Sequence, residues 1–182
     1  MRPSARIPGT MISWLCFEWK TSGLPKDEVS FEPFTIRIAE KPEQESILKA
    51  IKSAFSMDSV WGDVSRPLAE KIAVDLEAGF LLPEPSCVVL VHGTRVIGAS
   101  VLDVNPDAEN HLSSGPCILH EYRNRGLASA LLGASLAFLK KCDIPVARGL
   151  TRANSITARF IYPKFGSASH PVEGDPLKPK AD

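Results

Sequence analysis

The sequence predicts an α/β (α+β) fold in which helices flank a mixed, mostly antiparallel central sheet. Strand-like and helix-like hydrophobic patterns alternate along most of the chain, and this alternation favours helices packed against a sheet. Two apolar runs, residues 87–91 and 96–102, are separated only by the short turn His92-Gly93-Thr94. Because so short a turn reverses the chain, we expect the two runs to pair as an antiparallel hairpin.

The first half of the chain predicts an irregular arm, one strand and two helices. Residues 1–33 mix proline, glycine, serine and charged residues, so we expect an irregular N-terminal arm. Residues 34–39 alternate apolar and polar positions and predict the first strand. Pro42 and Pro67 each precede apolar residues at helical spacing, which predicts a helix after each, and Gly79 is expected to end the second helix.

The second half predicts two strands, two helices and a proline-rich tail. We expect these elements at residues 111–119 (strand), 126–142 (helix), 146–151 (strand), 154–165 (helix) and 167–182 (tail). Pro116 lies inside the first of these strands and cannot donate a hydrogen bond to a ladder. A bulge or a splayed edge is therefore expected there.

The composition is that of an ordinary globular domain. The chain has 182 residues, of which 44% are hydrophobic and 23% charged. Basic and acidic residues both number 21, so the net charge is zero and no binding to nucleic acid is expected. No apolar run approaches the roughly 18 residues that cross a membrane, so we expect no membrane association.

The cysteines favour a reducing, cytoplasmic compartment. No two of them are close enough in sequence to form a metal-binding knuckle, and three lie in apolar runs; they are Cys16, Cys87, Cys117 and Cys142. We therefore expect small buried hydrophobic residues, with neither a disulfide nor a bound metal.

A basic joint precedes the long helical pattern at residues 126–142. The first N–H groups of a helix have no intrahelical partner and carry partial positive charge. Arg123 and Arg125 add two full charges, and Gly126 lets the backbone approach a ligand closely. The joint is therefore suited to bind a phosphate or a pyrophosphate.

Two motifs carry a resemblance to a known family. The run Arg123-Asn124-Arg125-Gly126-Leu127-Ala128 fits a signature of Arg or Gln, two residues, Gly, one residue, then Gly or Ala. With the order of elements around it, this run resembles the GNAT superfamily of acetyl-CoA-dependent N-acetyltransferases, over about residues 34–166. Asn154, Tyr162, Lys164 and Gly166 resemble the second motif of that family.

The chain departs from the family pattern at its C-terminal end. The step from Asn154 to Tyr162 is one residue longer than usual, and only sixteen residues follow Gly166, where the family usually has two more strands. We expect a shortened C-terminal end. The acceptor side of the sheet would then be more open, or a second subunit would complete it in a homodimer.

The resemblance implies acetyl-CoA as cosubstrate and assigns residues to it. Its pantetheine arm would add to a strand edge, and its pyrophosphate would lie on the backbone amides of residues 125–128. The implied cofactor-binding residues are Cys117, Ile118, Leu119, Arg123, Arg125, Gly126, Leu127, Ala128 and Asn154. Asn154 would bond the cofactor amides or, alternatively, cap the last helix.

The implied reaction is transfer of an acetyl group to a primary amine of a small-molecule or peptide acceptor. Tyr162 would protonate the leaving thiolate, or would be only a packed helix tyrosine. Trp61, Asp63 and residues 105–111 would build the acceptor pocket. Candidates for the general base are Glu109, His111, His120 and Glu121. The alternatives are an inactive acyl-CoA-binding regulatory or scaffold module and an unrelated α/β phosphate-binding domain.

Overall fold

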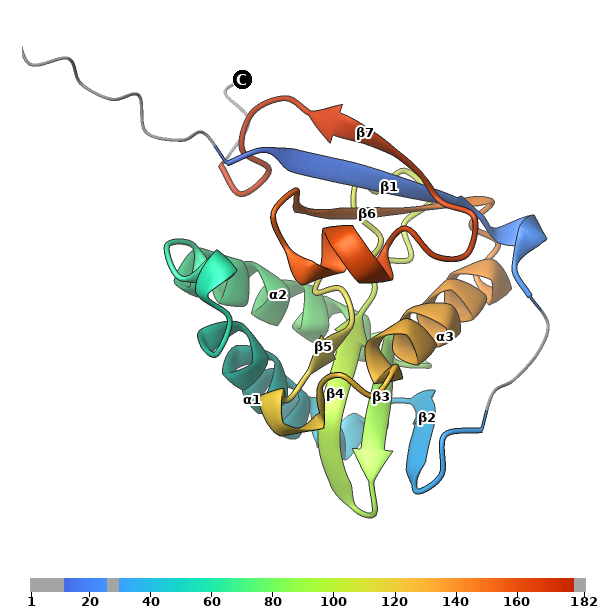
Figure 1. Cartoon of the computed structure of the whole chain (residues 1–182). Coiled ribbons are helices and arrows are strands. Elements are labelled where there is room, and N and C mark those ends of the chain that lie inside the picture. Colours follow the sequence, from blue (N-terminus) through green and yellow to red (C-terminus); the bar gives the residue numbers. More distant parts are fainter. Residues whose placement is uncertain (1–11, 26–29, 179–182) are drawn as a thin grey trace, which may run out of the picture.

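The computed structural model describes residues 12–25 and 30–178, and within them the chain forms two antiparallel sheets and three α-helices (Figure 1). The larger sheet has the order β2-β3-β4-β5. Its strands are β2 (Phe34–Ile38), β3 (Cys87–His92), β4 (Arg95–Val101) and β5 (Cys117–Ile118). Strands β3 and β4 pair directly, so the hairpin predicted from the sequence is confirmed.

Helices cover both faces of this sheet. The helices are α1 (Gln44–Ser56), α2 (Ser65–Phe80) and α3 (Leu127–Lys141). Strand β3 is buried on both sides: Val88 and Leu90 belong to one core, and Val89 belongs to another. The first core includes the buried side chains of α3, and the second includes those of α1 and α2. The two-sided burial explains why this strand is apolar without alternation.

The smaller sheet has the order β6-β1-β7, with strands β6 (Val146–Arg152), β1 (Trp14–Lys20) and β7 (Ala168–Val172). Its central strand corrects the prediction of an irregular arm over residues 1–33, of which 1–11 and 26–29 lie outside the described residues. Phe17 and Trp19 are buried in the α3-side core and hold the strand in place. The charged residues Glu18 and Lys20 interrupt the apolar residues of this strand, so its sequence does not show a strand pattern.

The C-terminal segment is also more ordered than predicted. Residues 168–172 of the expected tail pair with β1, and 179–182 lie outside the described residues. Strand β1, from the N-terminal part of the chain, thus lies between β6 and the C-terminal strand β7. The smaller sheet stands beside the splayed edge at β5 (Figure 1).

Two predicted elements are shorter than expected. The strand expected at 111–119 pairs only at Cys117–Ile118, because Gly115 has a left-handed φ of 62° and Pro116 has no N–H. The amide of Val101 instead donates to the Ser114 hydroxyl, at 2.9 Å. The helix expected at 154–165 is a single π-helical turn over Thr157–Ile161. No helix in the described ranges is long and apolar enough to cross a membrane.

Candidate active site

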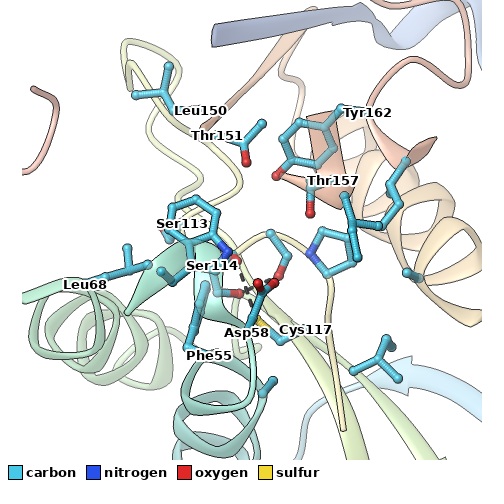
Figure 2. Close-up of a pocket in the computed structure, with 18 of the residues that line it drawn as sticks. Phe55, Asp58, Leu68, Ser113, Ser114, Cys117, Leu150, Thr151, Thr157 and Tyr162 are labelled. Carbon is cyan, nitrogen blue, oxygen red and sulfur yellow. Dashed lines mark hydrogen bonds between the residues drawn. The ribbon is translucent and has the colours of Figure 1, made fainter. Parts of the chain in front are cut away.

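A cleft of about 570 Å³ opens where the two sheets separate. Figure 2 shows Phe55, Asp58 and Leu68 on the α1–α2 side, and Leu150, Thr151, Thr157 and Tyr162 on the opposite side. Ser113, Ser114 and Cys117 lie between the two walls. The cleft lining also includes Arg123, Asn124 and residues 126–129 from the basic joint.

The basic joint presents the start of α3 to the cleft. Gly126 has a φ of 74°, a left-handed conformation that glycine adopts without steric cost. The hydrogen-bond ladder begins with the Ala130 amide, which donates to the Gly126 carbonyl, so the preceding amides point out of the helix start. Lys164 adds a positive charge at the same place, because its Nζ donates to Ser129 Oγ at 2.8 Å. Gly126, Leu127 and Ala128 thus lie where an anion can reach backbone amides.

The two arginines of the joint have different environments. Arg123 Nε donates to the Ile118 carbonyl at 3.1 Å, and its Nη2 donates to the Ala54 carbonyl at 2.8 Å. Its guanidinium therefore ties β5 to the last turn of α1. Arg125 is exposed, lies over the Tyr122 ring at 5.5 Å, and is outside the cleft lining. The positive side chain in the cleft that contacts the α3 start is that of Lys164.

The β5 edge forms the middle of the cleft. Cys117 and Ile118 line it, whereas Leu119 lies outside the lining. Because β5 is the outer strand of its sheet, one edge of this segment has no strand partner among the described residues. Burial raises the pKa of the Cys117 thiol to about 12, so the thiol is protonated at neutral pH. An extended ligand arm can add along this edge.

Tyr162 lies on the wall opposite β5, packed between aromatic side chains. Its ring meets Trp19 edge-on, with centroids 5.1 Å apart, and Phe17 at 5.4 Å. A Cβ at Gly115 would lie 2.8 Å from the tyrosine hydroxyl, and one at Gly149 would lie 2.9 Å from its ring. These two glycines therefore make room for the side chain. Burial raises the pKa of Tyr162 far above its ordinary value, so its hydroxyl is protonated at neutral pH.

Asn154 is not part of the cleft. It is exposed in the turn after β6, outside the lining residues. The capping role belongs to its neighbour Ser155, whose Oγ accepts from the Ala158 amide at 3.0 Å and contacts the Thr151 hydroxyl at 2.9 Å. The position of Asn154 therefore fits neither expected role, which were bonding the cofactor amides and capping the last helix.

The other end of the cleft has aromatic walls and carboxylates. The aromatic lining residues here are Trp14, Phe55 and Trp61, and the acidic ones are Asp58, Asp103 and Glu109. Trp14 belongs to β1, a strand that the sequence alone does not predict. Asp58 was missed because an aspartate before a turn reads as a cap, and it is one: its Oδ1 accepts from the Val60 amide at 3.1 Å.

Asp63 supports this wall without lining the cleft. It forms an ion pair with Arg152, with an Nη1–Oδ1 distance of 2.8 Å, and Arg152 lowers the pKa of the Asp63 carboxyl. The Arg152 guanidinium lies over the rings of Trp14 and Trp61, 5.6 and 5.5 Å from their centroids. Asp63 therefore lies outside the lining of this cleft, contrary to the prediction, whereas Trp61 lines it; the role of Trp61 in binding an acceptor stays a prediction.

The candidate bases differ in their positions. His111 is fully buried, with Nδ1 accepting from the Arg148 amide at 2.9 Å and Nε2 lying 3.1 Å from the Asn105 carbonyl. Both ring nitrogens are therefore engaged. His120 and Glu121 lie outside the cleft lining, and Glu109 lies within it.

Comparisons with known proteins identify the fold and the family. The model of the Acetyltransferase (GNAT) family matches residues 46–166. A GCN5-related N-acetyltransferase from Sphaerobacter thermophilus is similar in structure, with a TM-score of 0.60 and 15% identity over 88% of this chain and 49% of that one. A GNAT-family acetyltransferase from Colwellia psychrerythraea gives a TM-score of 0.58 and 15% identity over 88% and 53%.

A GCN5-related N-acetyltransferase from Kribbella flavida gives a TM-score of 0.51 and 15% identity over 91% of this chain and 60% of that one. This chain thus spans about half the length of the first two solved structures. No curated protein matches it. The solved structures confirm the predicted fold class. Because the family model covers more than half of the sequence, the chain belongs to the GNAT acetyltransferase family, whose cosubstrate is acetyl-CoA.

Proposed function

We propose that this chain transfers the acetyl group of acetyl-CoA to the primary amine of a small-molecule or peptide acceptor. The observation that carries the proposal is the continuity of one cleft. It runs from the amides at Gly126, past Tyr162, to the aromatic and acidic end at Trp61 and Asp58. The donor thioester would lie in the middle, and the amine would enter from the acidic end. The free cysteines among the described residues fit a reducing, cytoplasmic compartment.

The acceptor end favours an amine carried on an apolar body. Trp14, Phe55 and Trp61 offer aromatic surface, and Asp58 and Glu109 attract a cationic amine. An alkylammonium has a pKa near 10, so bringing its neutral form to the site at pH 7 costs roughly 4 kcal/mol. A nearby carboxylate, acting directly or through water, can accept this proton.

The transfer is direct. The neutral amine nitrogen forms a bond to the thioester carbonyl carbon and then gives up one proton to a nearby carboxylate or water. The carbon–sulfur bond breaks, the sulfur takes a proton from the Tyr162 hydroxyl, and the resulting phenolate is reprotonated from solvent before the next turnover. Backbone amides of the β5 edge hold the pantetheine arm. A covalent acetyl-cysteine intermediate at Cys117 is disfavoured, because the raised pKa of that thiol leaves almost no thiolate to attack.

The test is release of coenzyme A thiol from acetyl-CoA over a panel of hydrophobic monoamines, polyamines and lysine-containing peptides. We expect turnover with at least one acceptor class and a new amide bond by mass spectrometry. Binding of acetyl-CoA without turnover on any amine would favour the inactive binding module, and a hydroxyl or thiol acceptor would overturn the choice of an amine.

Asp58→Asn tests the acidic end of the cleft. We expect the acceptor KM to rise about tenfold, because the ammonium loses one charge-assisted hydrogen bond, while acetyl-CoA affinity is unchanged. Glu70→Gln is the matched control, since Glu70 pairs with Arg66 on the exposed face of α2. Equal effects of the two substitutions on the acceptor KM would show that Asp58 does not contact the acceptor.

A further inference from the structure

Three potential metal ligands meet on the face of the smaller sheet that carries Cys16. Cys16 and His170 are direct cross-strand partners in the β1–β7 pair, so their side chains lie on the same face. Glu18 is two residues along β1 and shares that face. The Sγ of Cys16, a carboxylate oxygen of Glu18 and an imidazole nitrogen of His170 all lie within 4.8 Å of one another.

These side chains line a second cavity, of about 610 Å³, whose charge favours a cation. Five carboxylates line it, against the two permanent positive charges of Arg148 and Lys178; the carboxylates are those of Glu18, Asp107, Glu109, Glu173 and Asp175. A negatively lined cavity raises the local concentration of cations. The burial of the three ligands is graded, from buried Cys16 to exposed His170, so an ion can enter from the His170 side.

The ligand types point to zinc. A thiolate, an imidazole and a carboxylate are the three ligand classes that Zn²⁺ takes in proteins, at bond lengths of about 2.0–2.3 Å. Tetrahedral bonds of that length place ligand atoms roughly 3.5 Å apart. Because the three atoms lie within 4.8 Å of one another, each pair must approach by at most about 1.3 Å. Rotation of the exposed His170 and half-exposed Glu18 side chains can supply this movement.

Arg148 supports the arrangement from the side. Its Nε donates to Glu18 Oε1 at 3.1 Å, so one carboxylate oxygen is held and the other remains for the ion. Such hydrogen bonds to ligating carboxylates orient them and tune metal affinity. The positive charge of Arg148 opposes the cation, and the four other carboxylates of the cavity offset it.

We propose that Cys16, Glu18 and His170 bind one zinc ion, with a fourth position open to the cavity. Binding exchanges the Cys16 thiol proton for a sulfur–zinc bond and releases that proton. The ion would join the N-terminal strand β1 to the C-terminal strand β7.

The site would also act on the acceptor end of the acetyltransferase cleft. The two cavities share four lining residues, namely Ala108, Glu109, Leu150 and Pro176. Trp14 of β1 and Leu177 after β7 line the acceptor end as well. An ion that joins β1 to β7 would therefore hold Trp14 and Leu177 in place at the acceptor end of the cleft. Sequence spacing cannot suggest this site, because its ligands lie on strands from opposite ends of the chain.

The full chain, stripped with a chelator and then dialysed, should be titrated with ZnCl₂ against a chromophoric zinc indicator, and separately with CoCl₂. We expect one zinc per chain with an affinity of micromolar or tighter, and a higher melting temperature in zinc. Cobalt should show the near-ultraviolet charge-transfer band of a thiolate ligand. No stoichiometric binding, or a cobalt spectrum without that band, would overturn the proposal.

Variants locate the site. His170→Ala should weaken zinc affinity roughly 100-fold or more, since even an outer partner of a metal ligand is worth roughly 10- to 100-fold. His170 is exposed, so this variant should fold, and Cys16→Ser should abolish the cobalt–thiolate band. His120→Ala and Cys142→Ser are the matched controls and should bind as the unmodified chain does. Equal affinity in the His170 and His120 variants would place the zinc elsewhere.

Discussion

At the scale of single residues, close packing surrounds Tyr162 and keeps its hydroxyl protonated. The tyrosine is 1% exposed, and the absence of side chains at Gly115 and Gly149 leaves room for its hydroxyl and its ring. Because burial raises the pKa of Tyr162, almost none of its phenolate form exists near neutral pH. Its place one residue beyond the family spacing is compatible with a cleft position, because the segment before it is a π turn.

Tyr162→Phe should lower kcat about 100-fold and leave both the KM for acetyl-CoA and the melting temperature nearly unchanged. The ring remains packed on Trp19, and only the proton donor is lost, for which general-acid catalysis typically contributes 10²–10⁴-fold. Steady-state kinetics with a saturating acceptor measure the effect. An unchanged kcat would leave the tyrosine with a packing role alone.

His111 predicts a dependence of stability on pH near neutrality. Burial, and then the charge of Arg148, lower the pKa of His111 in the folded state. Below about pH 6.5, the ordinary pKa of histidine, the His111 imidazole is protonated in the unfolded chain but stays neutral in the folded chain. Stability is therefore lost as the pH falls below about 6.5, by at most about 1.4 kcal/mol per pH unit.

His111→Asn should flatten this slope, since no imidazole remains to titrate. Urea unfolding of both proteins at several pH values between 7.5 and 5.5 measures it. If the two slopes are the same, another group titrates in this range.

At the scale of elements, Arg123 ties the basic joint and the adjacent strand β5 to α1, which lies far earlier in the chain. It bridges the basic joint to the Ile118 carbonyl of β5 and the Ala54 carbonyl of α1. The sequence suggests a phosphate ligand here because it shows the charge of Arg123. It does not show that the guanidinium donates to the carbonyls of Ile118 and Ala54. The glycine turn and the α3 start are local features, and for that reason the sequence predicts their positions well.

Arg123→Ala should destabilise the fold by about 2 kcal/mol, because two hydrogen bonds from a charged group are lost. Acetyl-CoA affinity should fall as the joint loosens. Arg125→Ala is the comparison and should change stability by less than about 0.5 kcal/mol, since that side chain is exposed. Urea unfolding and calorimetric titration of acetyl-CoA measure the two effects. Equal stability of the two variants would contradict the structural role of Arg123.

The limits of prediction at this scale are physical. Helices α1, α2 and α3 and the β3–β4 hairpin follow from patterns within one segment, so they are predicted to within a few residues. Strand β1 is held by partners far along the chain, as in the Glu18–Arg148 pair, which is 130 residues apart in sequence. Its charged residues look like those of a loop until β6 and β7 are placed on either side.

At the scale of the whole molecule, β1 links the core to the cleft. Trp19 is fully buried, packs against Tyr162, and donates from Nε1 to the Lys164 carbonyl at 2.8 Å. The Trp19 side chain therefore contacts both the Tyr162 ring and the backbone of Lys164, beside the α3 start.

Trp19→Ala should destabilise the chain by about 3–5 kcal/mol, as expected for a fully buried tryptophan. It should also lower kcat in the fraction that remains folded, because Tyr162 loses its support. Lys20→Ala, at the exposed end of the same strand, serves as the control in urea unfolding. A Trp19 variant as stable as the Lys20 variant would show that the smaller sheet does not depend on β1.

The pairing of β1 with β7 has a consequence for how this chain is connected. Trp14 lies opposite Val172 in an antiparallel pair, so the end of β7 adjoins the start of β1. A short hairpin could join them, and the chain could then be opened between β1 and β2. Such a circular permutant would keep every strand neighbour of the smaller sheet. It would also end in two consecutive strands, β7 followed by β1, which is the pair that the family pattern leads one to expect after Gly166.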